Sequence, residues 1–243
     1  MLRLHQQFEG DWKMNRLGIL LVGLLVAALV LFATMNNNGV SVVTKLPDPS
    51  VDETVAGKQG KETIVLAGGC FWGLQAVFQH VNGVSRVTSG YSGGAVKNPD
   101  YEEVSSGSTG HAESVEIVYE PSKVTLGQLL KVFFSVVHNP TELNRQGPDT
   151  GTQYRSAIFF GNAEQERIAA AYVSQLNKAK LFSGPIVTEV SPAHGFYAAE
   201  GYHQNYAALH PGNPYIAQND LPKVKNLEKE FPRLYRAEAA DVK

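Results

Sequence analysis

Residues 63–78 read TIVLAGGCFWGLQAVF and predict a strand, a glycine turn and a helix in succession. The first five residues are apolar and predict a buried strand. The last five place apolar side chains at helical spacing, which predicts a helix from about Phe71. Between them, Gly68 and Gly69 let the backbone turn sharply and let a ligand come close. Cys70 therefore lies on a strand-to-helix turn.

Cys70 has the properties of a nucleophile. It is the only cysteine in the chain, so it cannot form an intramolecular disulfide. At the first turn of a helix, the partial positive charge of the N-terminus favours the thiolate form. Two aromatic residues, Phe71 and Trp72, follow it directly. A single cysteine also excludes zinc fingers and cysteine-rich secreted scaffolds.

The composition fits one folded domain. The chain has 243 residues, 43% of them hydrophobic, which is enough to bury one good core. Its formal net charge is −2, and Lys and Arg do not cluster outside the N-terminus. The sequence therefore predicts no nucleic-acid partner.

The N-terminal region has a different character. Leu17–Met35 is an uncharged apolar run close to the roughly 20 residues that cross a bilayer. Arg3, Lys13 and Arg16 precede it, so the positive-inside rule places the N-terminus in the cytoplasm. We expect a single-pass membrane protein whose catalytic domain lies on the extracytoplasmic (periplasmic) side. The alternative is a secreted or periplasmic protein after signal cleavage, which translation from Met14 would favour.

Five segments follow from this pattern. They are a cytoplasmic N-terminus (1–16), a transmembrane signal anchor or signal peptide (17–35), a linker (36–60), a catalytic domain (61–234) and a polar tail (235–243). The linker is assigned from its Asn, Gly, Pro, Asp and Lys content.

Short strands and helices interleave irregularly along the domain. Strands are predicted at 63–67, 84–91, 113–119, 154–160 and 186–190. Helices are predicted from 71, after capping boxes at 125–128 and 162–165, and at 198–209. The predicted fold is α+β, a two-layer sandwich with a ferredoxin-like core of mixed sheet and helices, preceded by one N-terminal transmembrane helix.

Glu113 is the second informative residue. It shares the parity of Val115, Ile117 and Tyr119, which form the apolar face of their strand. A carboxyl group facing inward loses hydration, so its pKa rises and it can act as a general acid. The alternative is a strand-end glutamate in water, and the residues favour neither. Glu116 lies on the opposite face and is expected to be solvated.

Two further clusters surround glycine turns. Residues 149–156 read DTGTQYRS and carry acid and hydroxyl groups at a strand start. Tyr91 lies in the turn-rich sequence GYSGG at 90–94. Taken alone, both are better explained as ordinary turn chemistry beside core tyrosines.

Together these blocks resemble one family. The sequences GCFWG (69–73), GYSGG (90–94), GHAE (110–113) and DTGTQYRS (149–156) occur in this order, accompanied by NRQGP (144–148) and YHQNY (202–206). The ordered set resembles the A-type peptide methionine sulfoxide reductases, which act on the S epimer of the sulfoxide. The resemblance covers nearly all of 63–232.

The resemblance implies a role for each matching residue. Cys70 would attack the sulfoxide sulfur, and Glu113 would supply a proton to the oxygen. Tyr91 and Tyr154 match positions that hydrogen-bond this oxygen. Asp149 matches an acidic position that supports the site indirectly.

A sulfoxide substrate needs two kinds of side chain around it. A sulfoxide has an apolar methyl group and an oxygen that accepts hydrogen bonds, so it needs aromatic residues as well as proton donors. By the resemblance, Phe71 and Trp72 would surround the methyl group. The reaction would leave methionine and a sulfenic acid on Cys70. The implied substrates are free methionine sulfoxide and oxidised proteins or peptides, and the implied role is protein repair.

One feature departs from many members of that family, which carry further cysteines near the C-terminus. This chain has none, and around 212–216 it resembles the single-cysteine branch. No bound cofactor is implied. An external thiol, thioredoxin-like, glutaredoxin-like or another dithiol, must then reduce Cys70. Outside the cytoplasm, where disulfides are favoured, this requires a dedicated reductant.

Parts of the sequence would also fit other functions. A cysteine hydrolase would pair Cys70 with a histidine and an acid. A binding module would hold oxidised proteins without turning them over. Glu200 and His203 have the Glu-x-x-His spacing of a metal motif, but one copy is better explained as a satisfied pair on a helix. His111, His194 and His210 are likewise expected to be surface or hydrogen-bonded residues, and no metal site is predicted.

Overall fold

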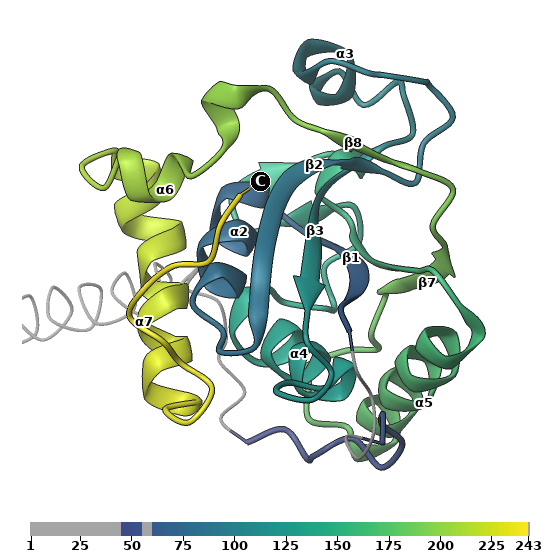
Figure 1. Cartoon of the computed structure of the whole chain (residues 1–243). Helices are drawn as coiled ribbons and strands as arrows, with labels where there is room; N and C mark the ends of the chain where they lie inside the picture. The colour runs from purple at the N-terminus through teal and green to yellow at the C-terminus, as the bar shows by residue number, and fades with distance from the viewer. Residues whose placement is uncertain (1–44, 55–59, 243) are drawn as a thin grey trace, which may run out of the picture. The chain divides into compact units, whose positions relative to one another are not determined.

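A computed structural model describes residues 45–54 and 60–242 (Figure 1). All of them belong to a unit that spans 39–243. The strands are β1 (Glu62–Gly68), β2 (Val84–Ser92), β3 (Ala112–Tyr119), β4 (Arg145–Gln146), β5 (Asp149–Thr150), β6 (Ser156–Phe160), β7 (Glu189–Pro192) and β8 (Phe196–Ala198). The α-helices are α2 (Phe71–Gln79), α3 (Tyr101–Ser105), α4 (Leu126–Val132), α5 (Ala163–Ala179), α6 (Tyr206–Leu209) and α7 (Leu221–Glu230).

Shorter helical turns complete the domain. Single π-helical turns run from Phe133 to Val137 and from Ile216 to Asp220, and 3-10 turns span Thr152–Tyr154 and Gly201–His203. The first of the π turns continues α4, so the apolar stripe predicted at 125–137 is divided between two helical forms.

Six strands form the main sheet in the order β7-β6-β1-β3-β2-β8. The central strands pair antiparallel, with Leu66 opposite Val115 between β1 and β3, and Tyr91 opposite Glu113 between β2 and β3. The edge pair β6–β7 is parallel. A separate two-stranded sheet joins β4 and β5. Figure 1 shows that β2 bends strongly along its length, so the sheet curls.

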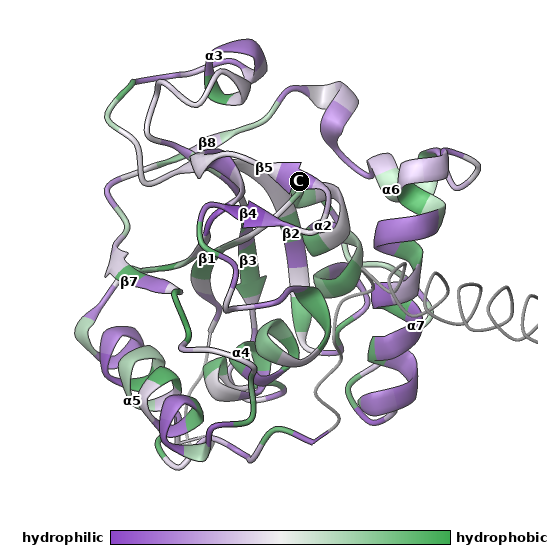
Figure 2. Ribbon diagram, turned by 180° about the vertical axis from the view of Figure 1, so that it is seen from behind, coloured by the Kyte–Doolittle hydropathy of each residue, from purple (hydrophilic) through white to green (hydrophobic). Residues whose placement is uncertain are grey.

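Helices α2 and α4 pack on the same face of the sheet. In Figure 1, α2 and α4 lie behind β2 and β3, and in Figure 2 the same helices come to the front. This face holds the larger core, which includes Leu66, Phe78 and Ile117. A small cluster around Phe159 covers part of the other face. Because Cys70 joins β1 to α2, the sulfur lies at the edge of the larger core.

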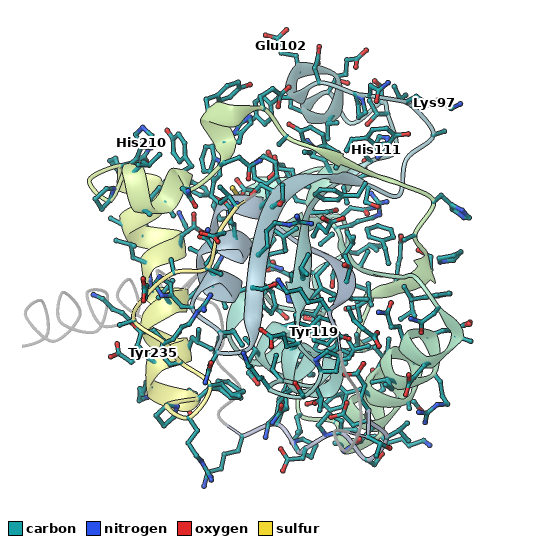
Figure 3. The ribbon with its side chains drawn as sticks, viewed as in Figure 1. Lys97, Glu102, His111, Tyr119, His210 and Tyr235 are labelled. Carbon is teal, nitrogen blue, oxygen red and sulfur yellow. The ribbon has the colours of Figure 1, made fainter. Side chains whose placement is uncertain are left out.

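The segment 45–54 packs against the domain, although it falls within the predicted linker. Leu46 is buried, and Asp48 forms an ion pair with Lys131 at 2.7 Å. Glu53 accepts hydrogen bonds from the Tyr119 hydroxyl (labelled in Figure 3) and from the Leu126 backbone N–H, both at 3.0 Å. A flexible linker therefore does not describe these ten residues.

The predicted polar tail also has fixed contacts. Tyr235, labelled in Figure 3, forms an isolated bridge with Val81. Asp241 pairs with Arg86 beside β2, and Ala240 is buried in the core. The tail thus continues the domain rather than leaving it.

The predicted two-layer sandwich with a ferredoxin-like core is wrong. The domain has a mixed α/β fold whose curled sheet is widened by β7 at one edge and β8 at the other. Helix α7 packs beside α2, as Figure 1 shows. The prediction missed this because β7 and β8 are short and follow irregular segments that carry little periodicity.

The predicted fold also included a transmembrane helix at 17–35, which lies outside the described residues. Across 45–54 and 60–242, no helix is long and apolar enough to cross a membrane. For the described residues the fold class is therefore the mixed α/β domain. The extracytoplasmic location inferred from that segment stays a prediction.

Candidate active site

Cys70 is the N-cap residue of α2. Its backbone is extended, with φ −56° and ψ 125°, and its side chain is only 8% exposed. Gly69 before it has φ +93°, and an added Cβ there would lie 2.8 Å from Gln146 Cβ. Only glycine allows this turn, which confirms that Cys70 sits between a buried strand and a helix.

Glu113 lies beside the start of α2. It is 2% exposed, and its Oε2 accepts a hydrogen bond from the Phe71 backbone N–H at 3.0 Å. Burial raises the pKa of Glu113 from 4.5 to about 8; the Phe71 N–H opposes this rise, and the charges of Asp149 and Asp220 add to it. The inward position predicted from strand parity is therefore the one the carboxyl group takes. By contrast, Glu116 pairs with Arg86 at 3.3 Å.

The thiol of Cys70 is held in its neutral form. Burial raises its pKa well above 9.0, and the nearby charges of Glu113 and Asp220 raise it further. The Trp72 backbone N–H and the Lys223 ammonium oppose this rise. The helix N-terminus favours the thiolate, but desolvation acts in the opposite direction and is the largest cause of the raised pKa.

Aromatic side chains form one wall of the site. Phe71 is fully buried, and its ring lies 6.4 Å from that of Trp72. Trp72 stacks on Tyr206 at 3.9 Å, and its Nε1–H donates to His203 Nδ1 at 3.2 Å. The indole is thus fixed on its face and at its edge. From the sequence, Tyr206 is placed in a family motif without a role, and His203 is given only the role of partner to Glu200.

Tyr154 and Tyr101 place hydroxyl groups near the thiol and Glu113. Both tyrosines have a raised pKa; burial is the main cause, and the nearby charges of Glu113, Cys70 and Asp149 contribute. For Tyr101 the pKa rises to about 12. The sequence reasoning assigned no role to Tyr101. The sequence does carry a signal for the helix that begins at Tyr101, because Asp100 and Glu103 form the capping box that starts α3.

Tyr91 directs its hydroxyl to Glu200. It is fully buried, and its Oη donates to Glu200 Oε2 at 2.9 Å. The other oxygen of Glu200 accepts the Tyr101 backbone N–H at 2.9 Å. The role of Tyr91 in binding the sulfoxide oxygen stays a prediction. The strand register places Tyr91 opposite Glu113. The Glu200 carboxylate links the Tyr91 hydroxyl to the Tyr101 backbone.

Asp149 enters the site from the β4–β5 hairpin. It accepts a hydrogen bond from the Tyr215 hydroxyl, and burial raises its pKa while Tyr215 and Lys223 oppose the rise. Tyr215 lies edge-on to Trp72, with ring centres 6.1 Å apart. The hairpin, the α2 start and the segment before α7 therefore meet at one place.

Comparison with known proteins identifies the family. The family model of peptide methionine sulfoxide reductase matches residues 62–234. The chain belongs to the peptide methionine sulfoxide reductase family. Its relatives include peptide methionine sulfoxide reductase MsrA 2 of Mesorhizobium japonicum, which is 60% identical over 76% of this chain and 94% of that protein. MsrA 2 of Synechocystis is 48% identical over 80% of this chain and 92% of that protein.

Solved structures of this family have a similar fold. Methionine sulfoxide reductase A of Corynebacterium diphtheriae is 38% identical, with a TM-score of 0.55, and the match covers 71% of this chain and 86% of that one. Mxr1 of Saccharomyces cerevisiae in reduced form is 29% identical, with a TM-score of 0.59, over 70% and 96%. The protein is thus an A-type peptide methionine sulfoxide reductase, an oxidoreductase that acts on methionine sulfoxide in protein repair.

The histidines of this methionine sulfoxide reductase have other partners. His138 is buried between the Phe133 carbonyl and the Ser156 hydroxyl, and burial lowers its pKa to about 3. His111, labelled in Figure 3, bonds the backbone of Gly94 and Val96. Across 45–54 and 60–242, no three metal-ligating side chains converge.

Proposed function

We propose that the protein reduces methionine S-sulfoxide, free or in proteins, through a sulfenic acid on Cys70 that an external thiol then reduces. One observation carries this proposal. Two acidic groups, the Cys70 thiol and the Glu113 carboxyl, are buried together at the start of α2, and their pKa values keep both protonated near neutral pH. A nucleophile and a proton donor are thus available in the same buried site, shielded from water.

The first half-reaction transfers one oxygen atom. The Cys70 sulfur attacks the sulfoxide sulfur, and Glu113 donates its proton to the sulfoxide oxygen while it accepts the thiol proton. The S–S bond formed by this attack then breaks as the hydroxyl passes from the sulfoxide sulfur to the Cys70 sulfur. The substrate sulfur keeps the electron pair and becomes a thioether, and the oxygen ends on Cys70 as a sulfenic acid. Glu113 relays one proton and is unchanged at the end. Its pKa of about 8 suits such a relay at neutral pH.

The walls of the site fit the two ends of the sulfoxide. We assign the methyl group to the wall of Phe71 and Trp72, where burial of a methyl group is favourable. The hydroxyls of Tyr101 and Tyr154 would donate to the oxygen, which gains negative charge as the sulfur is attacked. Asp149 supports the site through Tyr215 rather than by contact with the substrate.

The second half-reaction needs thiols from outside the chain. One thiol condenses with the Cys70 sulfenic acid, which forms a mixed disulfide and releases water. A second thiol attacks the outer sulfur and releases Cys70 as a thiolate. The donor is a dithiol of the thioredoxin or glutaredoxin class, because Cys70 is the only cysteine in the chain.

The test uses the full chain with dithiothreitol and the two separated epimers of methionine sulfoxide. We expect consumption of the S epimer alone. Without reductant, one methionine should form per chain, and dimedone should then label Cys70. The Cys70→Ser variant should do neither while it keeps the native circular dichroism spectrum.

Three results would reject the proposal. They are consumption of neither epimer by the folded protein, full activity of Cys70→Ser, and turnover of esters or amides with loss on histidine substitution. The last result would support a cysteine hydrolase instead. Binding of oxidised peptides without any methionine product would support a binding module.

A further inference from the structure

A buried ion pair lies beside the start of α2. Asp220 ends the π turn before α7 and is fully buried, and Lys223 in the first turn of α7 is 5% exposed. The Lys223 Nζ donates to Asp220 Oδ1 at 3.1 Å. The second oxygen of Asp220 is buried without a hydrogen bond from any described residue. A buried pair with an unsatisfied oxygen is poorly arranged for stability.

The pair is packed on the same helical turn as the nucleophile. Gly73 follows Cys70 by three residues, so the two lie on neighbouring positions of one helix face. An added Cβ at Gly73 would lie 2.8 Å from Lys223 Nζ and would collide with Asp220 Oδ1. Glycine at this position is what lets the charged groups approach α2.

The ammonium balances the acids of the site. Two carboxyl groups act on the thiol, Glu113 from β3 and Asp220 from the π turn, and the charge of Asp149 from β5 acts on both of these. The Tyr215 hydroxyl, bonded to Asp149, also lies within electrostatic reach of Cys70. Among the described residues, Lys223 is the cation whose charge acts on Cys70, and it acts on Asp149 as well.

We propose that the Lys223 ammonium stabilises negative charge on the Cys70 sulfur, and that Asp220 is a positioning residue that holds this ammonium against Gly73. This rests on the nucleophile proposed above. The charge forms twice in the cycle: when the thiol proton leaves for Glu113, and when the mixed disulfide with the external dithiol breaks. In the second case the Cys70 sulfur leaves with the electron pair of the S–S bond. Lys223 thus assists release in a chain that has no resolving cysteine.

The test measures alkylation of the full chain by iodoacetamide as a function of pH, with no sulfoxide present. Cys70 is the only cysteine, so the rate reports on it alone. In Lys223→Met we expect the rate at neutral pH to fall by about tenfold, because loss of a nearby cation reduces the thiolate fraction. In Asp220→Asn the rate should rise several-fold, because the amide oxygen can still accept the Lys223 hydrogen bond while the negative charge that raises the pKa of Cys70 is removed. The matched control, Lys225→Met, removes a cation from the exposed side of α7 and should leave the rate unchanged.

The opposite signs separate this role from a structural one. Equal slowing in both variants, or no change in a folded Lys223→Met, would overturn the proposal. If Lys223→Met does not fold, Asp220→Asn/Lys223→Met is compared with Asp220→Asn, since neither leaves a buried anion unpaired. The double variant must alkylate more slowly than the single one. Because no sulfoxide is used, this result stands apart from the test of the reductase activity.

The same variant should also slow turnover. With dithiothreitol as donor, we expect Lys223→Met to lower kcat about tenfold and to leave KM for the sulfoxide unchanged. A raised KM at unchanged kcat would place Lys223 in substrate binding and contradict the proposal.

Discussion

The N-termini of α2 and α4 differ in how their backbone donors are satisfied. The first three N–H groups of α4 each bond a side-chain oxygen: Leu126 bonds Glu53, Gly127 bonds Asp52, and Gln128 bonds Thr125. The N-cap of α2 is Cys70, whose side chain makes no capping hydrogen bond. Glu113 takes the Phe71 N–H from a neighbouring strand.

This difference separates a structural helix end from a reactive one. Carboxylates and a hydroxyl saturate α4, which stabilises the helix and leaves little for a ligand to gain. At α2, burial keeps the thiol and the carboxyl group protonated, so the same kind of helix end holds groups that can still exchange a proton. The predictions below test this contrast in order of decreasing effect.

Removal of the acid at α2 should have the largest effect. We expect Glu113→Gln to lower the rate of sulfoxide reduction by roughly 10²-fold or more, the usual contribution of a general acid. Binding of the sulfoxide should weaken much less. The wild-type rate should also fall as the pH rises through about 8, where Glu113 loses its proton, and this fall should vanish in the variant. Single-turnover methionine formation measures both, and Glu116→Gln is the matched control; a normal rate in Glu113→Gln would refute the acid role.

The same substitution should change how stability depends on pH. Burial raises the pKa of Glu113 from 4.5 to about 8, so between these values the folded state binds more protons than the unfolded state. The free energy of unfolding of the wild type therefore falls as pH rises through this window. Relative to wild type, Glu113→Gln should gain about 1 kcal/mol for each pH unit. Urea unfolding at several pH values measures this, and parallel profiles for the two proteins would contradict it.

The two tyrosines behind the reactive end should respond differently. Tyr101→Phe removes a hydroxyl near the thiol, and we expect the rate of sulfoxide reduction to fall about tenfold, as for loss of one hydrogen bond to a developing charge. Tyr91→Phe breaks only the bond to Glu200 and should cost less. Steady-state kinetics on both variants decide the order. A larger loss of rate in Tyr91→Phe than in Tyr101→Phe would indicate that Tyr91 contacts the sulfoxide oxygen.

Disruption of the α4 end should affect stability alone. Asp52→Ala removes the acceptor of the Gly127 N–H, and we expect the free energy of unfolding to fall by about 1 kcal/mol. Sulfoxide turnover below the unfolding transition should stay at the wild-type rate. Urea unfolding and activity assays on one sample test both statements, and a loss of turnover without a loss of stability would break the contrast.

Local patterns predicted the elements that carry their own signals. Thr125 and Asn162 are the N-caps of α4 and α5, where expected, because each side chain accepts a hydrogen bond from the backbone N–H three residues on. The full capping box forms only at Thr125, since Gln165 accepts the Gly161 N–H rather than that of Asn162. Strand parity placed Glu113 on the apolar face of β3, because alternation is local, but it left the buried and the solvated positions of the carboxyl group equally open.

Properties that depend on contacts between segments far apart in the chain could not be predicted from local sequence patterns. The neutral thiol of Cys70 depends on Glu113 and Asp220, which come from another strand and from the end of the chain. The choice between Tyr91 and Tyr101 depends on Glu200, which lies about 100 residues further on and binds both. The edge strand β8 has three residues and pairs with β2, so it has little periodicity of its own.

The segment 45–54 also bears on where the domain can be cut. A fragment that begins at 61 would remove Asp52 and Glu53 and strip two donors of α4 and the Tyr119 hydroxyl of their acceptors. Truncation or fusion at this end should therefore retain residue 45 onward. The useful boundary of the module lies before its first strand, in a stretch whose composition resembles a tether.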